Sequence, residues 1–268
     1  MRGVSDVPPV VLRPPAAGRR PFEVERMPPP AALADVVDHF WAVEWALPPG
    51  GRHRQDVVSH ATSHVTVEDG RVWVQGVVTR RFQRELTGRG RVVGAHLRPA
   101  GIGALTHVPP AMLTDRRLPG ERVLDDAAGL AAAVSAAPDA QTGMAAFAGW
   151  LTARDPRPPA GGHLVDEAVD LAAARPDLTR VDQLAAELGV TVRTLQRRFD
   201  RHLGAGPKWV LQRCRIQDAL ATIEAGGSVD WADLALRLGY ADQSHFVNSF
   251  TALVGVPPGE YTRRPPVG

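Results

Sequence analysis

The chain has 268 residues with a formal net charge of +2, and 44% of its residues are hydrophobic. This length suffices for two packed domains, but the small net charge does not by itself indicate a nucleic-acid partner. The single cysteine, Cys214, excludes a disulfide framework and a thiolate zinc site within one chain.

The N-terminal residues 1–30 are rich in proline and arginine, which predicts a flexible arm. No signal-peptide-like apolar run begins the chain, and no segment offers the about 20 uninterrupted apolar residues of a membrane-spanning helix. We therefore expect a cytoplasmic protein without a membrane partner. The heavy use of alanine, arginine, glycine and proline is typical of a GC-rich bacterial genome.

Residues 31–153 are predicted to form a β-rich domain with trailing helices. Short strand-like runs alternate with glycine, proline and Asp-Gly turn signals. They lie at Phe40–Leu47, His64–Val67, Arg71–Gln75, Phe82–Leu86 and Val92–Leu97. This spacing favours a small antiparallel sandwich or barrel. Candidate helices follow at Ala100–Thr106, Asp125–Ala137 and Ala140–Ala153.

The segment 154–162, RDPRPPAGG, has the composition of an interdomain linker, and residues 163–268 have a helical pattern. The expected fold class is therefore α+β, with a β-rich N-terminal domain and an all-α C-terminal domain. Within the C-terminal domain the pattern Leu-Ala-x-x-Leu-Gly occurs at 184–189 and, fifty residues later, at 234–239. Each copy predicts a short helix, a glycine stop, a turn and a second helix, which is the helix-turn-helix pattern.

The second helix of the first copy is predicted to be amphipathic. Its apolar side chains share one face, and they are Val192, Leu195 and Phe199. Arginines occupy the opposite face, at positions 193, 197 and 201, with Thr194 and Gln196 at the sides. Arginine can pair bidentately with guanine in the major groove, and glutamine with adenine. In the second copy Ser244, His245 and Asn248 are available to the groove without a full charge.

Positive charge is concentrated around the first copy. Residues 193–215 hold seven basic side chains and one acid, Asp200, so the local net charge is +6. Such a concentration predicts contact with DNA phosphates. The candidate phosphate contacts are Thr194, Arg198, Arg201, Lys208, Arg213 and Arg215. Cys214 lies within the same basic segment, and we expect it to pack rather than to react as a nucleophile.

Residues 163–264 resemble the DNA-binding domain of the AraC/XylS transcriptional regulators. The matching stretches are VDQLAAELGVTVRTLQRRF, GAGPKWVLQRCRIQDALATI and WADLALRLGYADQSHFVNSFTALVGVPPGEYTRR. The resemblance implies seven helices, with a long central helix that joins two helix-turn-helix units. It also implies base-reading positions at Arg193, Gln196, Arg197, Gln243, Ser244, His245 and Asn248. Many family members carry arginine or lysine where this chain has Asn248.

The β-rich part resembles the cupin-like sensor domains of such regulators through HFWAVEW at 39–45, VVGAHLRPAG at 92–101 and PPAMLTDRRLP at 109–119. The resemblance implies binding of a small molecule, dimerisation or both. Candidate effector-pocket residues are Trp41, Trp45, Trp73 and His96. Histidines 53, 60, 64 and 96 lack a tight His-x-His followed by a carboxylate, so we expect no metal and no cofactor.

The leading interpretation is a sequence-specific transcriptional regulator and not an enzyme. Its expected partners are operator or promoter DNA, RNA polymerase, a small-molecule effector and a second copy bound through the N-terminal domain. One alternative is an enzyme with a catalytic metal-binding cupin domain that is recruited to DNA. The other is a constitutive DNA-binding protein without an effector. Residues 160–268 are expected to fold and to bind DNA alone.

Overall fold

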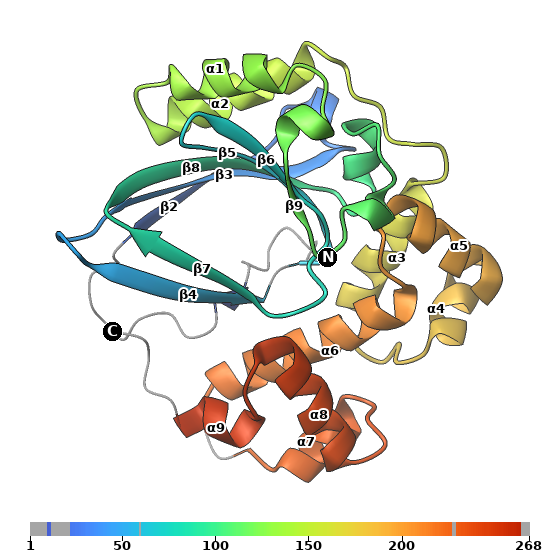
Figure 1. Cartoon of the computed structure of the whole chain (residues 1–268). Helices are drawn as coiled ribbons and strands as arrows, with labels where there is room; N and C mark the ends of the chain where they lie inside the picture. Colours follow the sequence, from blue (N-terminus) through green and yellow to red (C-terminus); the bar gives the residue numbers. More distant parts are fainter. Residues whose placement is uncertain (1–9, 12–21, 59, 227–228, 264–268) are drawn as a thin grey trace.

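The computed structural model describes residues 10–11, 22–58, 60–226 and 229–263. Its N-terminal part is rich in strands and its C-terminal part is helical, as the sequence predicts (Figure 1). Within these described ranges, no helix is both long and apolar enough to cross a membrane.

The strands form two antiparallel sheets. The larger sheet has the order β2-β3-β8-β5-β6-β9, with β2 Phe22–Met27, β3 Val37–Ala46, β8 Arg89–Leu97, β5 His64–Glu68, β6 Arg71–Gln75 and β9 Arg117–Pro119. The smaller sheet has the order β1-β4-β7, with β1 Val10–Val11, β4 Arg52–Val58 and β7 Phe82–Thr87. Asp69 and Gly70 join β5 to β6 with positive φ angles of 49° and 70°, as a tight Asp-Gly hairpin turn requires.

One face of the larger sheet is covered by α1, Ala127–Ser135, and α2, Ala140–Thr152 (Figure 1). Phe40 and Ala42 of β3 pair with Ala95 and Val93 of β8 on this face, and all four are at most 1% exposed. Because side chains alternate along a strand, the odd-numbered residues of β3 from His39 onward point to the opposite face.

The described residues from 163 to 263 form seven helices, as the family resemblance implies. They are α3 His163–Ala174, α4 Val181–Glu187, α5 Val192–His202, α6 Pro207–Glu224, α7 Trp231–Arg237, α8 Gln243–Val254 and α9 Pro258–Arg263. One apolar core joins α3, α4, α5 and the start of α6. A second core joins the end of α6 to α7, α8 and α9. The long helix α6 therefore connects two helix-turn-helix units.

The two units have matching turns. Gly189 and Gly239 follow the C-cap residues of α4 and α7 and adopt φ angles of +65° and +73°, in the left-handed region that glycine enters without a steric penalty. Thr191 and Asp242 are the N-cap residues that precede α5 and α8, and the side-chain oxygen of each accepts a backbone hydrogen bond from the residue three positions later. These caps satisfy N–H groups that lack a partner within the helix.

The strand-rich and helical parts share an apolar core. The core around α3 to α6 also contains three residues of the strand-rich part, which are Ala61, Val77 and Ala100. Arg98 Nη2 donates to Asp170 Oδ2 of α3 at 2.9 Å, and the Ala100 backbone N–H donates to Asp166 Oδ1 at 2.9 Å. The first helix-turn-helix unit is therefore packed directly against the strand-rich part.

Four strands were not predicted from the sequence, and the shortest of them, β1, lies within the expected N-terminal arm and pairs with β4. The flexible arm expected over residues 1–30 is wrong for 22–27, because β2 pairs with β3 along its whole length. Its sequence, FEVERM, lies at the sheet edge with four consecutive exposed residues, so it lacks the apolar alternation of a half-buried strand. β4 and β9 were missed because RHRQDVV is polar and RLP is short. Residues 1–9 and 12–21 of the expected arm lie outside the described residues.

Short 3-10 helices occur at η2 Ala31–Leu33, η3 Gly101–Ala104, η4 Pro110–Met112 and η5 Gly120–Arg122. The helix expected over Ala100–Thr106 is therefore a 3-10 turn. The segment 154–162 contains no helix or strand. Its Pro156 and Gly162 are buried, so this connection is packed against the rest of the protein.

Candidate nucleic-acid interface

Helix α5 separates an apolar face from a cationic one. Leu195 and Phe199 are fully buried in the first helical core. Arg193, Gln196 and Arg197, the base-reading candidates of the first copy, are exposed. Figure 1 shows α5 at the outer edge of the helical part. The helix thus presents two cations and an amide to solvent from a rigid base.

Helix α8 repeats this division with uncharged groups. Phe246 and Phe250 are fully buried in the second core. The base-reading candidates of the second copy are all exposed, and they are Gln243, Ser244, His245 and Asn248. On the buried side, Gln212 Nε2 of α6 donates to Ser249 Oγ at 2.9 Å, which fixes α8 against the connecting helix.

A cation from α6 reaches the turn between α7 and α8 in the second unit. The Arg215 guanidinium lies 4.8 Å from the centre of the Tyr240 ring and donates to the Gly239 carbonyl at 3.3 Å. The His245 ring meets the same tyrosine edge-on, with ring centres 5.2 Å apart. Arg215 therefore gives the second unit a positive charge that the sequence of α8 lacks.

Arg213 does not belong to the charged surface. Its side chain is only 2% exposed, and its Nε and Nη2 have no hydrogen-bond partner within the described ranges. The guanidinium lies 5.6 Å from the centre of the Trp209 ring, and burial lowers the pKa of Arg213 to about 10. The prediction that Arg213 contacts phosphate is therefore corrected, because a buried group cannot reach DNA without rearrangement.

The other phosphate candidates remain accessible to different degrees. Arg201 and Lys208 are exposed, and Arg198 and Arg215 are half-buried. Thr194 is half-buried, and its hydroxyl accepts a hydrogen bond from the Thr191 hydroxyl at 3.0 Å. Burial raises the pKa of the neighbouring Cys214 thiol to about 11, which leaves it protonated and agrees with a packing role.

The four effector candidates lie on the face of the larger sheet that α1 and α2 leave uncovered. Trp41 and Trp45 oppose Gly94 and Gly90 of β8, where a side chain would overlap the indole rings. Trp45 is 9% exposed and packs in a small cluster with Phe22 and Leu86.

Trp73 of β6 pairs with Thr66 of β5, Thr66 pairs with Gly94 of β8, and Gly94 pairs with Trp41 of β3. The two tryptophans therefore lie in one row across the sheet. The Arg117 guanidinium lies 4.2 Å from the centre of the Trp73 ring. His96 lies one pleat further along β8, on the same face. Trp41, Trp73 and Thr66 are half-buried rather than packed in a closed core.

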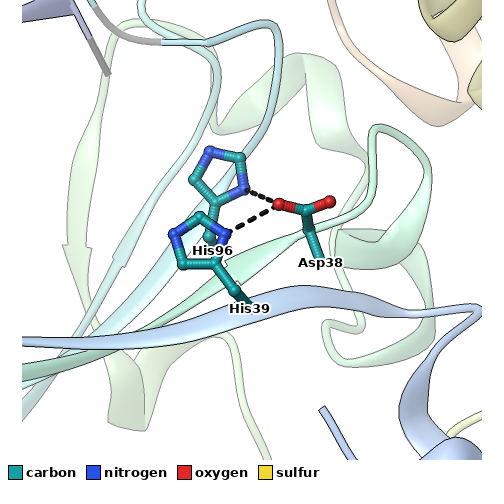
Figure 2. Close-up of side chains that lie close together, drawn as sticks. All are labelled: Asp38, His39 and His96. Atoms are coloured by element: carbon teal, nitrogen blue, oxygen red, sulfur yellow. Dashed lines mark hydrogen bonds and ion pairs between the residues drawn. The ribbon is translucent and has the colours of Figure 1, made fainter. Parts of the chain in front are cut away.

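A row of histidines crosses the same face. His39 of β3 and His64 of β5 both pair with His96 of β8. The His39 and His96 rings stack with centres 4.7 Å apart. Asp38 completes the group, and Figure 2 shows both imidazoles directed at one of its carboxylate oxygens. We define these three residues, Asp38, His39 and His96, as the Asp-His-His group.

Burial keeps several of these imidazoles neutral. It lowers the pKa of His60 to about 3 and that of His64 to about 4, and it holds the pKa of His96 well below its usual range. Sequence reasoning considered His60, His64 and His96 but missed Asp38 and His39. His39 and His96 are 57 positions apart in the sequence, and only the register of β3 against β8 brings them together. His53, by contrast, lies on β4 in the smaller sheet.

Two family models match parts of the chain. Residues 184–264 match a family described as "Helix-turn-helix domain", and residues 25–119 match one described as "Domain of unknown function (DUF6597)". A putative AraC-like transcription regulator of Streptomyces lividans is 34% identical over 85 residues, which are 32% of this chain and 28% of that protein. The chain therefore covers less than a third of that relative.

Solved structures with similarity to the chain include a transcriptional regulator from Chromobacterium violaceum with an AraC-type DNA-binding domain. It is 25% identical, with coverage of 39% of this chain and 94% of that chain and a TM-score of 0.35. ToxT from Vibrio cholerae is 11% identical, with coverage of 90% of this chain and 97% of that chain and a TM-score of 0.41.

Proposed function

We propose that this protein, whose residues 184–264 are a helix-turn-helix domain of the AraC type, reads two adjacent major-groove segments of an operator. The observation that carries the proposal is the division of α5. Its apolar side holds the core, while Arg193 and Arg197 are exposed. The proposal includes no catalytic step. It places the protein in the cytoplasm, where a regulator would meet bacterial DNA.

The proposed mechanism assigns different work to the exposed groups. Arg193, Gln196 and Arg197 read base edges from α5, since arginine and glutamine match guanine and adenine in the major groove. Helix α8 reads base edges with its own exposed polar side chains, which are Gln243, Ser244, His245 and Asn248. Contacts to phosphate fix the register of the protein on DNA but carry no sequence information, and we assign them to Thr194, Arg198, Arg201, Lys208 and Arg215.

We further propose that the face of the larger sheet opposite α1 and α2 receives a small-molecule effector. Trp41 and Trp73 are half-buried there, and aromatic walls with few polar groups are typical of ligand sites. The shared core between the strand-rich part and α3 to α6 offers a route by which such a ligand can bias the first helix-turn-helix unit.

The experiment begins with selection of a preferred DNA site from a random library by the full-length protein. Affinity for that site is then measured by fluorescence anisotropy at several salt concentrations. Phosphate contacts make log K fall linearly with log salt, with a slope of about −0.9 per contact. Arg201→Ala should reduce the magnitude of the slope by about one such contact.

The matched control is Arg71→Ala, which removes an exposed arginine from the β5–β6 hairpin of the strand-rich part. It should leave both the affinity and the slope unchanged. Equal effects of Arg201→Ala and Arg71→Ala would contradict the proposed location of the DNA surface, and so would an affinity that does not vary with salt.

A further inference from the structure

We propose that Asp38, His39 and His96 bind a divalent transition-metal ion between β3 and β8. Two imidazoles and one carboxylate form a donor set that suits zinc and other first-row metals. The site lies on the face of the larger sheet opposite α1 and α2, and it contains none of the candidate DNA-reading residues. It differs from the sequence-based expectation of no metal, which did not consider Asp38 and His39.

The distances within the Asp-His-His group fit a common metal. Asp38 Oδ2 lies 2.7 Å from His39 Nδ1 and 3.6 Å from His96 Nδ1, and the three ligand atoms lie within 4.8 Å of one another. Ligand atoms about 2.1 Å from one tetrahedral zinc ion are separated by about 3.4 Å. Small movements of side chains would therefore place all three atoms around one ion.

A strand irregularity makes this geometry possible. The register between β3 and β8 shifts between Val37 and His39, so Asp38 is an extra residue in β3. In a regular strand, Asp38 and His39 would point to opposite faces of the sheet. The bulge instead lets the Asp38 carboxylate meet the His39 and His96 imidazoles. Bulges often reorient a side chain next to a functional site.

The nitrogen atoms of His96 provide an independent indication of a ligand. Nε2 lies 3.1 Å from Thr62 Oγ1, whereas the buried Nδ1 has no hydrogen-bond partner in the described part of the chain. If the His96 Nε2–H donates to the Thr62 hydroxyl, His96 Nδ1 carries a lone pair that faces Asp38 Oδ2. Two hydrogen-bond acceptors then face each other. A cation between them removes this repulsion.

The opposite tautomer of His96 does not satisfy the group either. Its Nδ1–H would then point at Asp38 Oδ2 over 3.6 Å, which is too long for a hydrogen bond. Ligating histidines commonly donate their second N–H to a nearby acceptor, and Thr62 is placed to accept it. The His64 Nδ1 is also buried without a hydrogen-bond partner in the described residues, with its ring centre 4.6 Å from that of His96.

The Asp38 carboxylate attracts a cation, whereas two nearby arginines repel it. Arg26 and Arg98 are near enough to influence His96 and Asp38, and their positive charge opposes a cation. Three protein ligands leave at least one position for water or a small ligand.

The test uses untagged full-length protein that has been treated with a chelator and then freed of it. Cobalt is titrated while its visible absorption is followed, zinc is added in competition, and bound metal is counted by mass spectrometry. We expect one ion per chain. Zinc should also raise the thermal midpoint, because a ligand that binds only the folded state stabilises it.

Two variants and one control identify the ligands. Asp38→Asn keeps the size of the side chain, and His39→Gln changes a side chain that is 16% exposed, so at least one variant should fold. Each variant should weaken cobalt binding by more than about tenfold. Loss of a hydrogen bond that only supports a ligand already lowers metal affinity on the order of 10- to 100-fold, and these variants remove a ligand itself. His107→Gln, at an exposed histidine outside the group, should bind like the wild type.

Absence of cobalt binding by the wild type at millimolar concentration would overturn the proposal. Unchanged affinity in a folded His39→Gln or Asp38→Asn variant would also overturn it, since the metal would then lie elsewhere. The titration contains no DNA, so its outcome is independent of whether the protein binds an operator.

Discussion

Arg213 carries a charge that the interior does not compensate within the described ranges. Its guanidinium is buried beside Trp209, with two nitrogens unpartnered. Because burying an unpaired charge is costly, Arg213→Met should leave the free energy of unfolding unchanged or raise it by about 1 kcal/mol. Thermal unfolding measures this, with Arg201→Met as the exposed control. DNA affinity should fall in Arg201→Met and stay unchanged in Arg213→Met. A loss of affinity in Arg213→Met instead would mean that Arg213 moves to the phosphates.

Asp166 connects pH to the interface between the two parts. Burial raises the pKa of Asp166 to about 6. The hydrogen bond from the Ala100 N–H and the nearby Arg98 and His163 act to lower this pKa, whereas the nearby Asp170 acts to raise it. The folded protein therefore binds a proton more tightly than the unfolded chain between about pH 4 and 6. The contribution of Asp166 to stability is largest below this window and is lost as the pH rises through it.

Asp166→Asn should remove this dependence. We expect the stability of the wild type relative to the variant to fall by about 1 to 3 kcal/mol between pH 4 and pH 7. Denaturant unfolding of both proteins at each pH gives the difference. A difference that stays constant with pH, or that grows as the pH rises, would show that Asp166 is ionised throughout.

At the scale of the element, the two equivalent glycines of the repeat differ in their surroundings. A Cβ at Gly189 would meet no atom within 4 Å, whereas a Cβ at Gly239 would overlap the side chain of Thr179. Gly189→Ala should cost only the backbone strain of a positive φ, about 1 to 2 kcal/mol. Gly239→Ala should cost clearly more. Equal losses of unfolding free energy would mean that Thr179 moves aside freely.

The two recognition helices should also contribute unequally to affinity. Arg197→Ala in α5 should weaken specific binding at least about tenfold, because charge-assisted hydrogen bonds are about twice as strong as neutral ones. Asn248→Ala in α8 should cost less, although Arg215 gives the second unit some positive charge. Both proteins are titrated against one operator at one salt concentration, with circular dichroism as the control for folding. A larger loss for Asn248→Ala would mean that α8 anchors the complex.

The helical elements were predictable because their signals are local. The repeated Leu-Gly stops and the spacing of Leu195 and Phe199 each arise within one turn or one helix. The Asp-His-His group was not predictable, since it depends on a bulge and on strand register. Arg213 was misassigned for a related reason. A run of basic residues along α6 does not reveal which of them faces the core.

At the scale of the molecule, the helical part is not isolated from the strand-rich part. The Thr114 hydroxyl donates to the Gly204 carbonyl at the end of α5, in addition to the apolar contacts of Ala61, Val77 and Ala100 with the helical core. A fragment of residues 160–268 should still fold, because α3 to α6 and α6 to α9 each retain a core. Loss of these contacts should make its first unit less stable than in the full chain.

Hydrogen exchange compares the two proteins residue by residue. We expect weaker protection in α3 and α5 of the fragment and unchanged protection in α8. A fragment that is unfolded by circular dichroism would mean that the strand-rich part is needed for folding of the helical part. Equal protection in both proteins would mean that the shared core adds no stability.

The central claim is that two helix-turn-helix units on one rigid body read adjacent major-groove segments, and methylation interference on the selected DNA site tests it most directly. Modification of guanine N7 should block binding in two clusters on one face of the DNA, about one helical turn or 34 Å apart. Arg197→Ala should weaken interference in one cluster only. A single cluster, or two clusters on opposite faces of the DNA, would contradict the account.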